Sequence, residues 1–144
     1  MINRKPLIYL GAPYSDPDPE VVKDRMERFS ATHAMLIARG DITVSPLLNH
    51  DIVGRHTIKG DWAFWQTYSE NLLIRCDQLW IITLDGWQTS KGVLGEIAFA
   101  RTHAIPVGTI EPAPMPKYRL TGEDMLEIDR AYVREQRALF DQED

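Results

Sequence analysis

Residues 79–98, LWIITLDGWQTSKGVLGEIA, decide the fold of this chain. The first six residues form a continuous apolar run rich in β-branched and aromatic side chains, which is typical of a parallel strand buried on both faces. A turn containing glycine follows, and then a helical pattern that contains Glu96. Glu96 is therefore expected just beyond the carboxyl end of a strand, where open α/β sheets bind their ligands.

The turn after this strand has the composition of an anion-binding loop. Gly86 and Gly92 can adopt positive φ and let a ligand approach the backbone, while Ser90 supplies a hydroxyl. The helix that follows begins with free N–H groups, which favour an anion such as phosphate. The alternative is a plain strand-to-helix turn in which Ser90 is the N-cap and Glu96 is solvated.

The rest of the chain alternates between strand and helix. Further strands are expected at residues 7–10, 42–44 and 105–110, and helices at 19–39, 61–75, 92–103 and, after a proline-rich connector, 121–140. Residues 45–60 read as a long loop with a short helical piece. This alternation predicts an α/β fold in which helices sandwich a parallel sheet of about four to five strands.

Several local signals fix where the helices begin and what they bury. Asp18 and Asp61 are expected N-caps, and Thr121 with Asp124 resembles a shortened capping box. In the helix at 61–75, the residues expected to face the core are Trp65, Tyr68, Leu72 and Leu73. The terminal helix has an apolar stripe that either covers the sheet or packs on a partner subunit, formed by Met125, Ile128, Tyr132 and Leu139.

Length and composition predict one domain, residues 1–144, with its core at about 6–110 and a C-terminal helix at 118–141. The chain has 144 residues, 44% of them hydrophobic, and a net charge of -5. The negative charge argues against a nucleic-acid or anionic-membrane surface, so a small molecule or another protein is the expected partner. Cys76 is the single cysteine, which favours a reducing cytoplasm, and the N-terminal apolar run is too short for a membrane span.

Three loops should meet at one edge of the sheet: residues 11–15, 45–60 and 85–92, with Glu96 behind them. If Tyr9 points toward the crevice, its phenol can hydrogen-bond Glu96 and orient the carboxylate; otherwise it is a half-buried core aromatic. The helix macrodipole is expected to favour ionised Glu96 by about 0.3 to 1 kcal/mol. An ionised glutamate can attack the anomeric carbon of a ribosyl group without a metal or cofactor.

Other polar and aromatic residues leave alternatives open. The grouping that suggests a metal is His50, Asp51, His56 and Asp61, but it lacks a strong ligand spacing, so no metal site is expected. Trp62, Trp65 and Trp87 either stack a nucleobase or pack in the core, and Trp87 is the best candidate for stacking because it lies in the ligand loop. Lys91 either helps to hold an anion or is solvated.

Three motifs carry a resemblance to a known family. They are IYLGAPYS at 8–15, CDQLWI at 76–81, and DGW-x-x-S-x-G-x-x-x-E at 85–96. In this order they resemble the nucleoside 2-deoxyribosyltransferase-like superfamily, and within it the DUF1937 branch of bacterial and phage proteins. The resemblance covers about the first 110 residues.

This resemblance implies a flavodoxin-like three-layer sandwich, with Glu96 as nucleophile and Tyr9 near it. Such families cleave or transfer the N-glycosidic bond of deoxynucleosides or nucleoside 5'-monophosphates. Ser90 stands where the transferases have a sugar-binding Asp, as in the nucleotide-hydrolysing relatives, whose Ser contacts phosphate. The family's acid falls at Ser69 or Asn71, neither of which is a carboxylic acid. Either Asp85 protonates the leaving base instead, or the chain no longer turns over a nucleoside.

The preferred hypothesis is a nucleoside or nucleotide N-glycosidase or deoxyribosyltransferase. Its catalytic residues are Glu96, Tyr9 and Asp85, with no cofactor. The expected substrate-binding residues are Gly11, Pro13, Tyr14, Ser15, His50, Trp87, Ser90 and Gly92. The resemblance also implies a homo-oligomer in which a neighbouring subunit completes the site. The alternative is a non-catalytic nucleotide-sensing module on the same fold.

Overall fold

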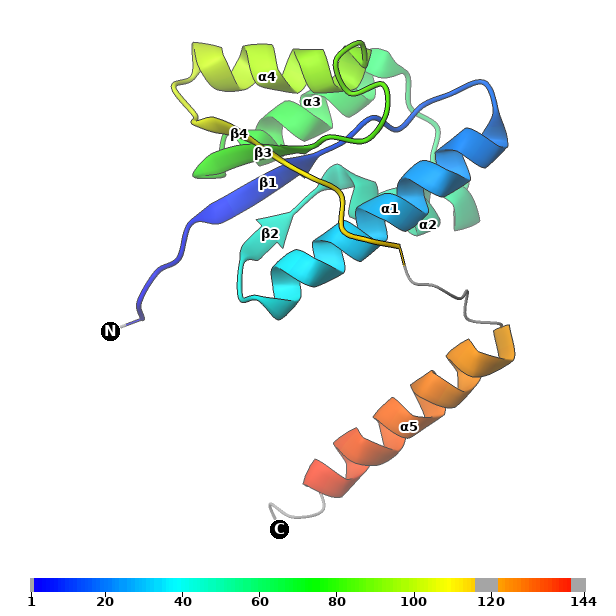
Figure 1. Ribbon diagram of the computed structural model, residues 1–144. Helices are drawn as coiled ribbons and strands as arrows, with labels where there is room; N and C mark the ends of the chain where they lie inside the picture. The colour runs from blue at the N-terminus through cyan, green and yellow to red at the C-terminus, as the bar shows by residue number, and fades with distance from the viewer. Residues whose placement is uncertain (1, 116–121, 141–144) are drawn as a thin grey trace. The chain divides into compact units, whose positions relative to one another are not determined.

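The computed structural model describes residues 2–115 and 122–140 (Figure 1). The chain divides into two compact units, Met1–Pro114 and Met115–Asp144. The first unit contains the sheet and every residue expected at the site. The second unit contains one long helix and is considered separately.

The described chain forms one sheet of four parallel strands, which confirms the α/β fold. The strands are β1 (Leu7–Gly11), β2 (Ile42–Val44), β3 (Gln78–Ile82) and β4 (Val107–Ile110), in the order β2-β1-β3-β4. In the register of the sheet, Tyr9 lies between Val44 of β2 and Leu79 of β3. β1 and β3 are therefore central neighbours, and their carboxyl ends lie side by side.

Helices cover both faces of the sheet. Figure 1 shows α3 (Trp62–Leu73) and α4 (Lys91–Thr102) on one face, and α1 (Pro19–Ala38) on the other. Each face has its own core. Tyr9 belongs to the cluster with Leu73 and Val93, whereas Ile8 belongs to the cluster with Phe29 of α1. Because side chains alternate along a strand, Tyr9 points toward α4, the helix that carries Glu96.

The expected caps at Asp18 and Asp61 are confirmed, and Ser90 is the N-cap of α4, as in the alternative interpretation of its loop. Asp18, Asp61 and Ser90 accept hydrogen bonds from the backbone N–H groups of Glu20, Phe64 and Val93. Each cap satisfies one of the orphan donors at a helix start and contributes roughly 1 kcal/mol. They fix where α1, α3 and α4 leave the carboxyl edge of the sheet, which is the edge that the site occupies.

The short helical piece expected within residues 45–60 is confirmed. This segment contains a 3-10 turn, η1 (Pro46–Asn49), and a short helix, α2 (His50–Arg55). Two strand boundaries, in contrast, are corrected. β3 ends at Ile82, although the apolar run continues, because buried Leu84 lies in a turn where its N–H donates to the Ile82 carbonyl. β4 begins at Val107, because the N–H of Ile105 still bonds to Ala100 at the end of α4.

One expected core position in α3 is wrong. Leu73 is fully buried, but Tyr68 keeps 43% of its surface exposed. Its hydroxyl accepts a hydrogen bond from Asn49 Nδ2 at 2.9 Å, so Tyr68 joins α3 to η1. The helical spacing of apolar residues correctly predicted the helix, but it wrongly placed Tyr68 on the side that faces the core.

The second unit contains α5 (Gly122–Phe140), which has acidic residues in its first turn and Arg137 in its last. Ile128, Tyr132 and Leu139 of the expected stripe are exposed. Thr121, the proposed cap, lies outside the described residues. Within residues 2–115 and 122–140, no helix is long and apolar enough to cross a membrane.

Candidate active site

The site is built around a hydrogen bond between β1 and α4. The Tyr9 hydroxyl donates to Glu96 Oε1 at 3.0 Å, which confirms the contact expected from the sequence. Tyr9 is completely buried, and Glu96 lies in the second turn of α4, beyond the carboxyl end of β3. The strand and the helix together fix both partners, so the carboxyl group has a defined orientation.

Gly11 allows the Glu96 carboxyl group to reach this position. A Cβ atom at residue 11 would collide with Glu96 Oε2 and would also lie 2.7 Å from Ile81 Cδ1. The carboxyl group therefore rests on the bare backbone at the end of β1. The absence of a side chain at Gly11 thus lets the Glu96 side chain approach the backbone of β1 closely.

The second carboxyl oxygen is buried without a partner. Glu96 as a residue is partly exposed, but its Oε2 is shielded from solvent and has no hydrogen-bond partner among the described residues. Buried polar atoms in folded proteins are nearly always hydrogen-bonded, so an unpaired carboxyl oxygen is an unusual feature. It is the oxygen of the carboxyl group whose hydrogen-bonding capacity the described residues leave unused.

Burial also changes the protonation of this pair. Desolvation raises the pKa of Glu96 to about 8, and the hydrogen bond from Tyr9 opposes that rise. Burial outweighs the small stabilisation of ionised Glu96 expected from the macrodipole, and Glu96 lies past the first turn of α4. Burial and the neighbouring Glu96 raise the pKa of Tyr9, so Tyr9 remains a neutral donor.

Ser69 and Asn71, the two positions that the resemblance left open for an acid, lie in different surroundings. Ser69 of α3 hydrogen-bonds the Tyr9 hydroxyl and lowers the pKa of Tyr9. Asn71 instead donates to the Thr67 carbonyl at 2.9 Å and lines a hollow on the outer side of α3. Of the two registers left open by the sequence, Ser69 is the one next to the Tyr9–Glu96 pair.

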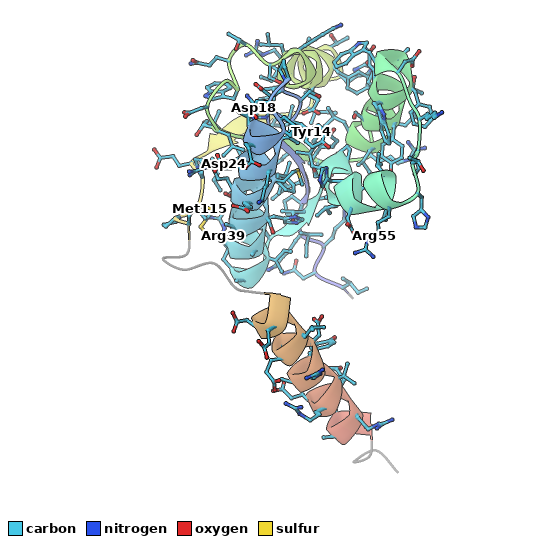
Figure 2. All side chains as sticks on the ribbon, turned by 90° about the vertical axis from the view of Figure 1, so that its right-hand side faces the viewer. Tyr14, Asp18, Asp24, Arg39, Arg55 and Met115 are labelled. Carbon is cyan, nitrogen blue, oxygen red and sulfur yellow. The ribbon has the colours of Figure 1, made fainter. Side chains whose placement is uncertain are left out.

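Two further contacts bring the 45–60 segment toward the loop after β1. Tyr14 Oη lies 2.6 Å from His50 Nδ1, and their rings meet edge to face at 5.5 Å. Figure 2 shows Tyr14 at the same end of α1 as Asp18, far from Arg39. Asn49, next to His50, connects onward to Tyr68 of α3. The first and second strand-end loops are therefore joined, as the topology predicted.

The other expected binding residues occupy different environments. Pro13 is fully buried, while Ser15 and Asp85 are exposed. Trp87 packs against the core cluster that contains Tyr9, and its stacking on a base stays a prediction.

The start of α4 retains room for a ligand. Ser90 Oγ accepts the capping hydrogen bond from Val93 N–H, which leaves the hydroxyl hydrogen free to donate. A Cβ at Gly92 would meet only Ser90 Oγ, at 3.9 Å, so the space beside Gly92 is open. Lys91 places its ammonium 4.4 Å from the centre of the Trp62 ring, a cation–π contact at the neighbouring end of α3.

Three of the four residues that suggested a metal set make other contacts. Asp51 pairs with Arg55 at 2.9 Å, Asp61 caps α3, and His50 contacts Tyr14. The structure therefore gives each of these side chains a local structural contact.

Sequence reasoning missed Arg25 of α1. Its guanidinium donates to the carbonyls of Ser15 and Tyr14, at 2.8 and 3.4 Å, and to that of Asp85 at 3.4 Å. A lone arginine on a helix gives no sequence signal for such a contact, because its partners are backbone atoms of distant loops.

The fold and the site define an α/β protein with a buried tyrosine–glutamate pair at the carboxyl edge of its parallel sheet. A family model described as "Domain of unknown function (DUF1937)" matches residues 6–111, from before β1 to just after β4. The chain therefore belongs to the DUF1937 family. No curated protein matches the chain.

Proposed function

We propose that this protein cleaves or transfers the N-glycosidic bond of nucleosides or nucleoside 5'-monophosphates through a covalent glycosyl-Glu96 intermediate. The observation that carries the proposal is the Glu96 carboxyl group, held by Tyr9 at Oε1, seated on Gly11 and unpaired at Oε2. The resemblance to nucleoside 2-deoxyribosyltransferase-like proteins supplies the substrate class.

The proposed reaction has two displacements at C1'. In the first, Glu96 Oε2 forms a bond to C1' while the bond from C1' to the base nitrogen breaks, and the base leaves with the electron pair. In the second, water or an acceptor base attacks C1' and releases the Glu96 carboxylate. Tyr9 holds Oε1 throughout, so the lone pairs of Oε2 keep their direction.

The raised pKa of Glu96 suits a nucleophile that must be poorly solvated. Attack requires the carboxylate, and the positive charge that develops at C1' favours ionisation of Glu96 as the transition state forms. In the free protein Glu96 is mainly protonated at neutral pH, since its pKa is about 8. The proposal therefore predicts faster turnover at mildly alkaline pH.

A nucleotide substrate is favoured by the start of α4. Ser90, the open space at Gly92 and the free N–H groups of the first turn can receive a phosphate. The other proposed binding residues are Gly11, Pro13, Tyr14, Ser15, His50 and Trp87. We further propose that the protein acts in the cytoplasm as a homo-oligomer.

Protonation of the leaving base is assigned to Asp85. Its side chain is exposed in the loop after β3, whereas Ser69 occupies the place of the family's acid and hydrogen-bonds Tyr9. The hydroxyl of Ser69 cannot act as a carboxylic acid. This difference also favours a second candidate function, a nucleotide sensor that binds without turnover.

The two functions are separated by measuring base release and binding together. The wild type and Glu96→Ala are incubated with a panel of nucleosides and 5'-monophosphates, free base is followed by chromatography, and binding is followed by calorimetry. The enzyme hypothesis expects base release or exchange that Glu96→Ala lacks. Binding of a monophosphate without release or exchange of base would favour the sensor and exclude the enzyme.

A further inference from the structure

We infer that Arg25 is a positioning residue that ties the loop after β1 to the loop after β3, so that the ligand-binding groups on both loops keep one geometry. The consequence for a ligand rests on the proposed function of the site. The connection between the two loops does not depend on the proposed function, because it consists of hydrogen bonds within the chain. We call this connection the tie.

The contacts of Arg25 join residues 14–15 to residue 85, two segments that are far apart in the sequence. Nη1 donates to the carbonyls of Ser15 and Tyr14, and Nη2 donates to the carbonyl of Asp85. One planar guanidinium thus serves both loops. Lysine cannot reproduce this arrangement, because its ammonium is a compact point charge on a flexible stem.

Gly86 completes the fit. It has φ +88°, a conformation that L side chains rarely adopt, and a Cβ there would lie 3.0 Å from Arg25 Nη2. The guanidinium therefore packs into the space beside Gly86 as well as bonding to the preceding residue. The loop after β3 is shaped to receive this arginine.

The two loops have few alternative ties. β1 and β3 are hydrogen-bonded along the sheet, but among the described residues no backbone hydrogen bond joins residues 12–17 to residues 83–90. The first loop carries Tyr14, which contacts His50, and the second leads to Ser90 at the start of α4. A fixed distance between the loops therefore fixes the distance between the groups proposed to bind substrate.

The tie is tested by hydrogen exchange on the full chain. Three amides report on the loops: Asp18, which donates to Asp16 Oδ1, and Trp87 and Thr89, which donate to carbonyls within the second loop. Losing charge-assisted hydrogen bonds of this kind corresponds to about tenfold or more in local opening. Arg25→Met and Arg25→Lys are both expected to speed exchange at all three reporters by about tenfold or more.

The matched control is Arg28→Met. Arg28 lies one turn further along α1 and makes a surface pair with Asp24 at 2.9 Å, so its loss should leave the loop amides unchanged. The amides of β3 should exchange at the wild-type rate in every variant, which separates loop opening from unfolding. Wild-type exchange at the three reporters in Arg25→Met would overturn the tie, as would wild-type exchange in Arg25→Lys, since charge alone would then suffice.

Kinetics connect the tie to the proposed reaction. For base release from a 5'-monophosphate, Arg25→Met should raise KM about tenfold or more while kcat falls less, because Tyr9 and Glu96 are held by β1 and α4. If the wild type releases no base, the proposed reaction is wrong, and the exchange measurement still decides the tie. An unchanged KM in an active Arg25→Met variant would remove its positioning role.

Discussion

Replacing Glu96 with glutamine should change how the stability of the protein depends on pH. The pKa of Glu96 is raised from its ordinary 4.5 to about 8, because the carboxyl group is desolvated. The folded state therefore holds the proton more tightly than the unfolded state does. Below the pKa of Glu96 in the unfolded state, Glu96 is protonated in both states, and the free energy of unfolding is not reduced. As pH rises from about 4.5 to about 8, wild-type stability falls, and above that range the loss is complete.

The size of this effect follows from linkage. Each tenfold difference in proton affinity is worth about 1.4 kcal/mol, so the full loss is about 5 kcal/mol, and about 4 kcal/mol of it falls between pH 5 and pH 8.5. Glu96→Gln cannot ionise and should not show this component. At this chain length, 4 kcal/mol corresponds to roughly 10 °C in Tm.

The assay is urea unfolding of the wild type and Glu96→Gln at several pH values between 5 and 8.5. A difference in the free energy of unfolding that is the same at every pH reports the altered hydrogen bonding at residue 96. The comparison therefore uses the slope of the free energy of unfolding against pH. Groups common to both, such as His33, cancel in that comparison. Glu111→Gln, which changes an exposed glutamate after β4, is the control and should follow the wild type. Parallel stability curves for wild type and Glu96→Gln would refute the account of a desolvated carboxyl group.

Four further variants, one of them a control, test other parts of the site. Gly11→Ala places a Cβ against Glu96 Oε2 and Ile81, so thermal unfolding should show a loss of about 1 to 3 kcal/mol and the base-release assay a loss of turnover; a variant with wild-type stability and turnover would contradict the close approach. Tyr9→Phe removes the donor that favours the Glu96 carboxylate, so the acidic limb of the kcat/KM profile, expected near pH 8, should move to higher pH. An acidic limb at the wild-type pH would show that Tyr9 does not affect the pKa of Glu96. Ser90→Ala and Asp18→Ala should each cost about 1 kcal/mol as lost caps, but only Ser90→Ala should also raise KM for a 5'-monophosphate, and equal KM values would exclude phosphate binding by Ser90.

The fold was predictable where local chemistry and burial agree. The apolar runs predicted the four strands of the described sheet, and the side chains of Asp18 and Asp61 marked two helix starts as caps. Strand ends were less predictable. Leu84 remains buried after the backbone has left the sheet, so hydrophobicity alone extended β3 too far.

The Tyr9–Glu96 contact was predictable from topology, because both residues lie at the carboxyl edge of adjacent elements. The protonation of Glu96 was not. It depends on the burial of the carboxyl group in the folded chain, and helix position alone suggested the opposite effect. Arg25 was also inaccessible to sequence reasoning, since its partners are backbone carbonyls assembled only by the fold.

The most direct test of the central claim is the chemical state of Glu96 during turnover. A 5'-monophosphate is mixed with the protein, the reaction is quenched with acid, and the peptide that contains Glu96 is examined by mass spectrometry. The account predicts a sugar-phosphate ester on Glu96 in the wild type and no adduct in Glu96→Gln. Base release by Glu96→Gln at the wild-type rate, or an adduct on another residue, would contradict it.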